Sequence, residues 1–286
     1  MSITAIRKLA LNEDAVKGLY SRILEIPSLR GQFWDITSAE IIELVWGKIA
    51  DTTKSADPFY SLKLEQNKRI MEVYPFLEKL VDEASDPLYT AVKLAILGNA
   101  IDVMISDSRQ YIESSITEKL EAPISKAMYG EFKKRLKQSR RLLFFGDNAG
   151  EIVFDRLLIE TIRKMYDPEI SFVVRSVPAL NDATLDEARV VGIDKIATLV
   201  ENGIDGPLPG TILKRCSNEV NDLARRADLI ISKGGGNFDT LEEEKGFLKD
   251  KITFMLLSKC DPYYQYFGVE IHQPILANFF GISSPN

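Results

Sequence analysis

The sequence predicts an α/β protein in which a helical part precedes a mainly parallel sheet with helices on its faces. Up to about residue 130, apolar residues recur every three to four positions, which is the spacing of amphipathic helices. From Arg141 onward, short apolar runs alternate with amphipathic segments, and that alternation favours a parallel sheet covered by helices. We therefore expect a helical lobe over 1–138 and an α/β domain over 139–286.

The composition limits the possible functions. With 286 residues and 45% apolar residues, the chain can form one large domain or two modest ones. A net charge of -6 argues against a nucleic-acid partner. No apolar run approaches the roughly 18 residues that a membrane span requires, and the amphipathic N-terminus lacks the features of a signal peptide. We expect a cytoplasmic protein without a membrane partner.

Cysteine and histidine are too scarce for several common site chemistries. Cys216 and Cys260 provide no disulfide framework. His272 is the single histidine, which excludes a histidine-rich metal centre and makes a Ser-His-Asp triad a poor candidate.

Start signals mark the helices of the N-terminal part. Thr37-Ser38-Ala39-Glu40 fits a capping box before an apolar-periodic segment. Asp86-Pro87 opens another helix, which we expect from Leu88 to about Met104. That helix would contain Gly98-Asn99, and a glycine in a helix interior usually indicates close packing. The basic run Lys133–Arg141 is interpreted as the positively charged end of a helix.

Five apolar runs are expected to form the strands of the sheet. They are Leu142–Phe145, Ile170–Val174, Ile196–Val200, Leu229–Ile231 and Ile252–Leu257. The helices between them are expected near 150–166, 184–191, 211–227 and 237–245. Ligands of such sheets bind at the carboxyl ends of the strands, so the residues that follow each run are the candidate site.

The first strand is followed by Gly146-Asp147-Asn148-Ala149-Gly150 and then by a helix that starts at Glu151. Two interpretations fit this corner. Asp147 and Asn148 provide one charged and one neutral oxygen ligand for a hard divalent cation. Alternatively, Asn148 caps the helix and Glu151 completes an N-x-x-E box. The two are compatible, since Glu151 could orient a ligand from behind.

The second strand is followed by Arg175-Ser176 and then by Asn181-Asp182. Adjacent parallel strands bring their end loops together, so Asp182 is expected near Asp147, where it would complete a Mg²⁺ or Mn²⁺ site. Taken alone, Asn181 or Asp182 is also a good helix cap. Arg175 suits bidentate phosphate binding, with an ion pair to a site acid as the alternative.

The fourth strand is followed by Lys233-Gly234-Gly235-Gly236-Asn237. Three glycines let backbone N–H groups approach an anion, and Lys233 adds a point charge. The spacing is neither that of a Walker A loop nor that of a dinucleotide-binding G-x-G-x-x-G.

The order of these motifs resembles the damage-control phosphatase family of metal-dependent phosphatases. The resemblance is carried by GDNAGEIVFD, RSVPALNDAT, SKGGGNFDTL and LSKC, and by the N-terminal segments DPFYSLKLEQN and LAILGNAID. It implies a helical lobe on a three-layer α/β/α sandwich with a Rossmann-like sheet. It further implies a divalent metal held by Asp147, Asn148 and Asp182, and a phosphate engaged by the segment Lys233–Asn237. Related members of the family are described as carboxyl methyltransferases of acidic residues.

The sequence departs from the family pattern at two places. The C-x-x-C pair that usually opens archaeal and bacterial members is missing. Asp239 follows Gly236-Asn237-Phe238, where the family usually has glutamate. We expect the shorter acid to alter a contact behind the site more than the reaction.

The expected activity is hydrolysis of a small phosphorylated metabolite, such as a sugar phosphate or a damaged phospho-cofactor, with Mg²⁺, Mn²⁺, Co²⁺ or Ni²⁺ as the cofactor. The metal would activate a water that Glu151 helps to position. The phosphate and the rest of the substrate would contact the following residues: Arg175, Ser176, Asn181, Lys233, Gly234, Gly235, Gly236 and Asn237. An S-adenosylmethionine-dependent carboxyl methyltransferase and a non-enzymatic binding protein for a metal or a phosphorylated ligand remain the alternatives.

Overall fold

A single six-stranded sheet forms the centre of the computed structural model, which describes residues 6, 9, 11–103, 108–248 and 250–279. Its strands are β1 (Arg141–Phe145), β2 (Glu169–Val174), β3 (Thr198–Glu201), β4 (Leu229–Lys233), β5 (Ile252–Leu257) and β6 (Pro274–Asn278). Their spatial order is β3-β2-β1-β4-β5-β6, with β1 to β5 parallel and β6 antiparallel to β5. This confirms the predicted fold class. The order is that of a doubly wound sheet, in which successive strands are added on one side of β1 up to β3 and on the other side from β4 onward.

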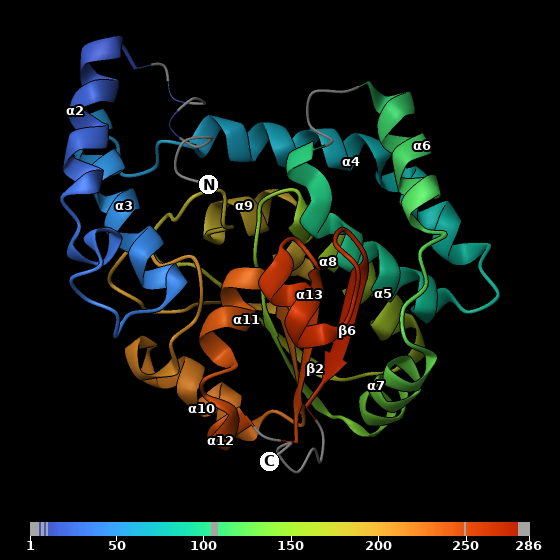
Figure 1. Ribbon diagram of the computed structural model, residues 1–286. Coiled ribbons are helices and arrows are strands. Elements are labelled where there is room, and N and C mark those ends of the chain that lie inside the picture. The colour runs from blue at the N-terminus through green and yellow to red at the C-terminus, as the bar shows by residue number, and fades with distance from the viewer. Residues whose placement is uncertain (1–5, 7–8, 10, 104–107, 249, 280–286) are drawn as a thin grey trace.

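The helices before the sheet lie around its left, top and right sides in the view of Figure 1. They are α2 (Glu13–Leu24), α3 (Ser38–Thr53), α4 (Tyr60–Asp82), α5 (Pro87–Leu97), α6 (Arg109–Lys119) and α7 (Lys126–Gln138), with a 3-10 turn, η1, over Pro27–Arg30. The Thr37–Glu40 capping box and the Asp86 cap are both present, as predicted. The predicted helix from Leu88 to Met104 was too long, because α5 stops at Leu97 and a 3-10 segment, η2 (Gly98–Val103), follows it; Met104 lies outside the described residues.

The helices between and after the strands are shorter. They are α8 (Glu151–Met165), α9 (Leu185–Val190), α10 (Asn218–Arg226), α11 (Gly235–Leu241), α12 (Lys245–Leu248) and α13 (Asp261–Phe267). Two 3-10 turns, η3 (Ile193–Lys195) and η4 (Leu213–Arg215), lie before β3 and α10. The predicted segment 211–227 therefore divides into η4 and α10, and 237–245 divides into α11 and the start of α12.

The sheet is buried on both faces, which makes the molecule three-layered. Alternate strand residues point to opposite sides, so Phe144 and Ile231 face one core while Phe145 and Ile230 face the other. The first core contains side chains of α4, α5, α7 and α8, and the second contains side chains of α10 and α11. Helices that precede the sheet therefore share one continuous core with it.

No helix within the described part of the chain is both long enough and apolar enough to cross a membrane.

Candidate functional site

The candidate site lies at the carboxyl ends of β1 and β4, where the strand order reverses. Two loops are joined there by short backbone bonds: Ala183 N donates to Asp147 O at 2.7 Å, and Ala149 N donates to Asn181 O at 2.8 Å. Asn148 and Asp182 form an isolated β-bridge between the same loops. The pairing of β1 with β2 thus brings Asp147, Asn148, Asn181 and Asp182 together, as the sequence predicted.

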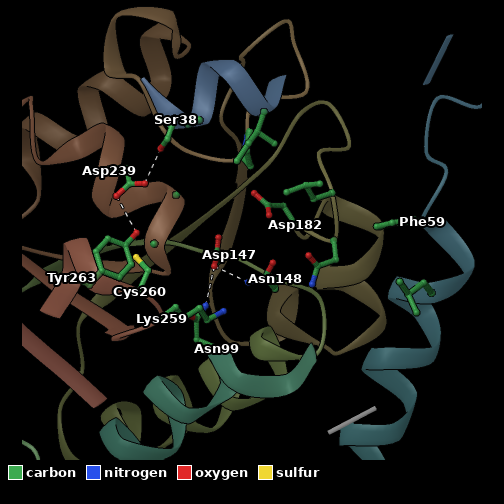
Figure 2. Close-up of a pocket in the computed structure, with 18 residues that line it drawn as sticks. Ser38, Phe59, Asn99, Asp147, Asn148, Asp182, Asp239, Lys259, Cys260 and Tyr263 are labelled. Atoms are coloured by element: carbon green, nitrogen blue, oxygen red, sulfur yellow. Dashed lines mark hydrogen bonds between the residues drawn. The ribbon is translucent and has the colours of Figure 1, made fainter. Parts of the chain in front are cut away.

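These residues line one end of a cavity of about 600 Å³. Figure 2 shows Asp147, Asn148 and Asp182 close to one another, with Asn99 and Lys259 beside them. Asp147 and Asp182 are buried, whereas Lys259 is exposed. The cavity therefore has an acidic end next to a solvent-accessible lysine.

Two amide side chains support the buried carboxylates. Asn99 Nδ2 donates to Asp147 Oδ2 at 3.1 Å and to Glu151 Oε2 at 2.8 Å. Asn148 Nδ2 donates to the same two oxygens at 2.7 and 3.2 Å. Asn148 is therefore not the predicted helix cap: α8 starts after Gly150, which has φ +78° and no capping side chain.

Gly150 is held instead by the helical part of the chain. Its N–H donates to Asn67 Oδ1 of α4 at 2.6 Å, and Asn67 Nδ2 lies 3.4 Å from Glu187 O. Helix α9 has its own capping box between Thr184 and Glu187, so neither Asn181 nor Asp182 caps it. The loop residues are thus left for a role in the cavity.

Arg175 forms the ion pair that the sequence offered as its alternative role. Its Nε donates to Asp182 Oδ2 at 2.7 Å, and its Nη2 lies 3.7 Å from Asp147 Oδ1. Nη1 donates to Gly210 O and to Asn237 Oδ1. Arg175 is buried beneath the acids and is not part of the cavity lining.

Lys233 points into the protein and away from the cavity. It is fully buried, and its Nζ donates to Ala95 O, Glu151 Oε1 and Asp155 Oδ1. Asn237 is buried too, and its Nδ2 donates to Gly146 O and Lys233 O. The structure therefore places both side chains behind the site, where they brace it.

Ser176 also lies outside the cavity lining, with its Oγ accepting the N–H of Gly203 at 2.6 Å. Asn181, Gly235 and Gly236 do line the cavity. Of the predicted substrate-binding residues, these three are the ones that the structure brings next to the acids.

The three glycines after β4 are required for close packing. A Cβ at Gly234 would overlap the Asp147 carboxylate, one at Gly235 would overlap the Tyr263 hydroxyl, and one at Gly236 would overlap Pro209 O. Gly234 also has φ +77°, which side-chain-bearing residues rarely adopt. The glycines thus allow the start of α11 to approach Asp147.

The buried charges at the site do not balance. Five buried carboxyls, Asp147, Glu151, Asp155, Asp182 and Glu187, lie near three buried cations, Arg175, Lys233 and Lys63. Burial, together with the charges of Asp182 and Glu151, raises the pKa of Asp147 well above its usual value, despite Arg175. Burial also raises the pKa of Asp182 and of Asp155. Although burial favours its neutral form, the charges of Asp155 and Glu151 hold the pKa of Lys233 above the usual lysine value.

This arrangement fits a hard divalent cation. Two carboxylates and amide oxygens are the ligands such a cation prefers, and two surplus negative charges match its charge. Asn99 Oδ1 is buried and has no hydrogen-bond partner, as expected of an oxygen left for a ligand. Within the described residues no cluster of three or more His, Cys, Asp or Glu could hold a metal, so amide oxygens would have to contribute.

Several lining residues were not predicted from the sequence. Lys259 follows β5, where the sequence indicated only a polar strand end. Asp239 accepts from Ser38 Oγ and from Tyr263 Oη, each at 2.9 Å, and thereby joins α11 to α3 and α13 (Figure 2). These residues are far apart in the chain, so no local spacing could have revealed the contact.

The chain matches known proteins over most of its length. Residues 16–274 match the model of the Damage-control phosphatase ARMT1-like domain. A protein of Archaeoglobus fulgidus named damage-control phosphatase is 33% identical over 218 residues, covering 75% of this chain and 73% of that protein. A damage-control phosphatase of Pyrococcus horikoshii is 32% identical over 208 residues, covering 71% and 68%.

A further relative carries no functional name, and one solved structure is similar. The uncharacterized protein of Methanocaldococcus jannaschii is 34% identical over 226 residues, covering 77% of this chain and 73% of that protein. The crystal structure of a DUF89 family protein from Pyrococcus horikoshii superposes with a TM-score of 0.85 at 25% identity, covering 96% of this chain and 94% of that chain.

Proposed function

This chain belongs to the damage-control phosphatase ARMT1-like family, and we propose that it is a metal-dependent phosphatase. Its substrate would be a phosphomonoester of a small metabolite. The observation that carries the proposal is the convergence of Asp147, Asn148 and Asp182 at one end of a cavity, with surplus negative charge buried around them. A protein interior tolerates such a surplus only with a compensating cation or bound protons.

The cation would be held by Asp147, Asn148 and Asp182, with Asn99 Oδ1 available beside them. When bound, it would supply positive charge to the phosphate and acidify a water. Glu151 accepts hydrogen bonds from the side-chain amides of Asn99 and Asn148 at Oε2 and so positions them. Lys233 holds the other carboxylate oxygen of Glu151, Oε1. Arg175 orients Asp182 in the same way. Glu151 and Arg175 thus set the ligand geometry from behind.

The phosphate would lie between the acidic end and Lys259. Gly235 and Gly236 line the cavity at the start of α11, where helical N–H groups have no partner within the helix. Asn181 lies on the opposite loop and can donate its amide to the ester. The other predicted substrate-binding residues pack behind the lining and would affect the substrate only by positioning the lining residues. They are Arg175, Ser176, Lys233, Gly234 and Asn237.

The proposal is tested by measuring phosphate release from a panel of phosphomonoesters with Mg²⁺, Mn²⁺, Co²⁺ or Ni²⁺, before and after chelation. We expect turnover that chelation abolishes and that one of these metals restores. Asp147→Asn should reduce kcat/KM by at least about 100-fold, the scale of losing one strong electrostatic contact to the transition state. Asp167→Asn, an exposed carboxyl beyond the end of α8, is the matched control.

Three outcomes would contradict the proposal. Wild-type turnover in Asp147→Asn would remove that carboxylate from the mechanism. Binding of phosphorylated ligands without hydrolysis under every metal would favour a binding protein, and binding of S-adenosylmethionine without metal would favour the methyltransferase.

A further inference from the structure

We propose that the alcohol part of the substrate carries an apolar chain or ring, and that Ile42, Leu62 and Leu180 select it. This inference rests on the proposed phosphatase function and concerns the apolar part of the cavity lining. It specifies the class of phosphomonoester.

The cavity is much larger than the acidic end needs. A cavity of about 600 Å³ lies within the size range of sites for whole metabolites. Besides the acids and Lys259, the cavity has an apolar wall, which is defined by the following residues: Ala39, Ile42, Phe59, Leu62, Leu180 and Pro209. None of these side chains has a hydrogen-bonding group, so the wall can recognise its ligand only by shape and by burial of apolar surface.

The wall is built from segments that are distant in sequence. Ile42 lies on α3, Leu62 lies on α4, and Leu180 lies on the loop between β2 and α9. Ile42, Leu62 and Leu180 are only partly buried, so each keeps surface that a ligand can cover. Phe59 is anchored by an edge-on contact with Trp46, at 4.9 Å between ring centroids, and provides a fixed floor.

Leu180 is held in the wall by an unusual backbone. Its φ of +50° lies in the left-handed region, which leucine rarely adopts. Trp46 Nε1 donates to Pro178 O at 3.2 Å and Asp182 N donates to Ala179 O at 2.9 Å, so contacts on both sides fix this turn. Backbone of this kind is concentrated at ligand sites, and here it places an apolar side chain two residues from Asp182.

Three polar residues of the lining, Ser38, Asp239 and Tyr263, are paired with one another. Asp239 accepts from both Ser38 and Tyr263, so the hydroxyl protons of both residues are already used. A polyol phosphate would therefore press several hydroxyls against hydrocarbon, which costs free energy unless each finds a partner. An alcohol with an apolar chain or ring would instead gain from the same contact.

The test compares primary alkyl phosphates, whose alcohols are similar leaving groups, so that differences in rate report binding. Ethyl, butyl, 3-methylbutyl and 2-phenylethyl phosphate are assayed beside glycerol 3-phosphate, using the metal-loaded full-length enzyme. We expect kcat/KM to rise with each buried methylene, by up to about fourfold. Equal or better hydrolysis of glycerol 3-phosphate would overturn the inference and leave the phosphatase function intact. Failure to hydrolyse any ester with any metal would instead defeat the proposed function.

Two variants on separate elements test whether the apolar wall is responsible for the preference for apolar esters. Leu180→Asn removes the apolar side chain with a residue that tolerates positive φ, and Ile42→Ser removes one from α3. Each should lower the preference for 2-phenylethyl phosphate over glycerol 3-phosphate by about tenfold. Ile41→Ser, next in sequence but outside the lining, should leave the preference unchanged. An unchanged preference in both wall variants, with folding verified by thermal unfolding, would refute the assignment.

Discussion

Lys259 is the cation best placed to meet a phosphate. Among the Lys and Arg side chains in the described part of the chain, it is the one that lines the cavity, and its charge acts on Asp147. We predict that Lys259→Met raises KM for the preferred ester about 10- to 100-fold, because a hydrogen bond to a charged group contributes roughly 1.5–3 kcal/mol.

Steady-state kinetics of Lys259→Met, Lys259→Arg and Lys214→Met measures this effect. The arginine variant should retain part of the affinity, and Lys214, an exposed lysine on η4, serves as the charge-matched control. An unchanged KM in Lys259→Met would place the phosphate elsewhere.

For Lys233, in contrast, we predict a loss of stability and not a specific rise in KM. Replacing it by methionine leaves Glu151 and Asp155 buried without their cation, which should destabilise the fold by about 3–5 kcal/mol. Chemical denaturation of Lys233→Met and of Lys233→Met/Asp155→Asn measures the cost, and we expect the second change to recover part of it. A large rise in KM with unchanged stability would instead show that Lys233 contacts the substrate.

At the level of single residues, the sequence identified the loops correctly, but it could not give the direction of their side chains. Lys233 follows a glycine-rich pattern that suits anion binding, yet a strand that alternates its faces turns this side chain into the α5–α8 core. Arg175 points beneath the acids because it pairs with Asp182, which lies seven residues later at the same sheet edge. The predicted roles of the site residues themselves remain predictions.

At the level of elements, β1 and β5 were predictable because each is a continuous apolar run buried on both faces. The edge strand β3 is mostly unburied, and its predicted run, Ile196–Val200, began two residues before the observed strand. Strand β6 was missed because it begins at Pro274 and lies antiparallel at the sheet edge, where a proline is tolerated and the apolar pattern is short. Helix α13 was missed too, since it has only seven residues and none of them is fully buried. It nevertheless provides Tyr263 to the cavity.

The turn between β4 and α11 is the most sensitive element of the site. We predict that Gly234→Ala abolishes metal-induced stabilisation, because the added Cβ would displace the Asp147 carboxylate. Gly268→Ala is a control that also changes a glycine at positive φ, but with open space around it. It should cost about 1–2 kcal/mol of stability and keep the metal response.

Thermal unfolding with and without Mn²⁺ distinguishes the two glycine variants. A metal response that survives in Gly234→Ala would mean that Asp147 is not part of the cation site. Loss of the response in Gly268→Ala would mean that the effect is not local to Asp147.

At the level of the whole molecule, the helices before the sheet complete both the core and the site. Ile70, Leu94 and Leu136 lie in the same core as Phe144 and Met255. Asn67 of α4 and Asn99 of η2 reach the corner after β1 directly. The sequence indicates Asn67 and Asn99 as polar residues that could face the sheet edge, but which atoms they contact depends on how the segments pack.

The surplus of buried acids predicts how stability depends on pH without metal. The pKa values of Asp147, Asp182 and Asp155 are raised, so the folded protein binds protons that the unfolded chain releases. Stability of the metal-free protein should therefore fall as pH rises above about 4, through the raised pKa values. Bound cation replaces those protons, so the increase in Tm caused by Mn²⁺ should grow between pH 5 and pH 8.

Differential scanning fluorimetry in chelator and in Mn²⁺ across that range tests this dependence, with the chelator series as the reference. A Tm increase that is independent of pH would show that cation binding displaces no protons from these carboxyls.

The measurement that tests the account most directly is an anomalous difference map from a crystal grown with Mn²⁺. We predict a single strong peak bounded by oxygens of Asp147, Asn148 and Asp182, at the end of the cavity next to Lys259, in a protein whose phosphate release depends on that metal. An active, Mn²⁺-dependent enzyme whose peak lies away from Asp147, or whose cavity holds no peak, would contradict it.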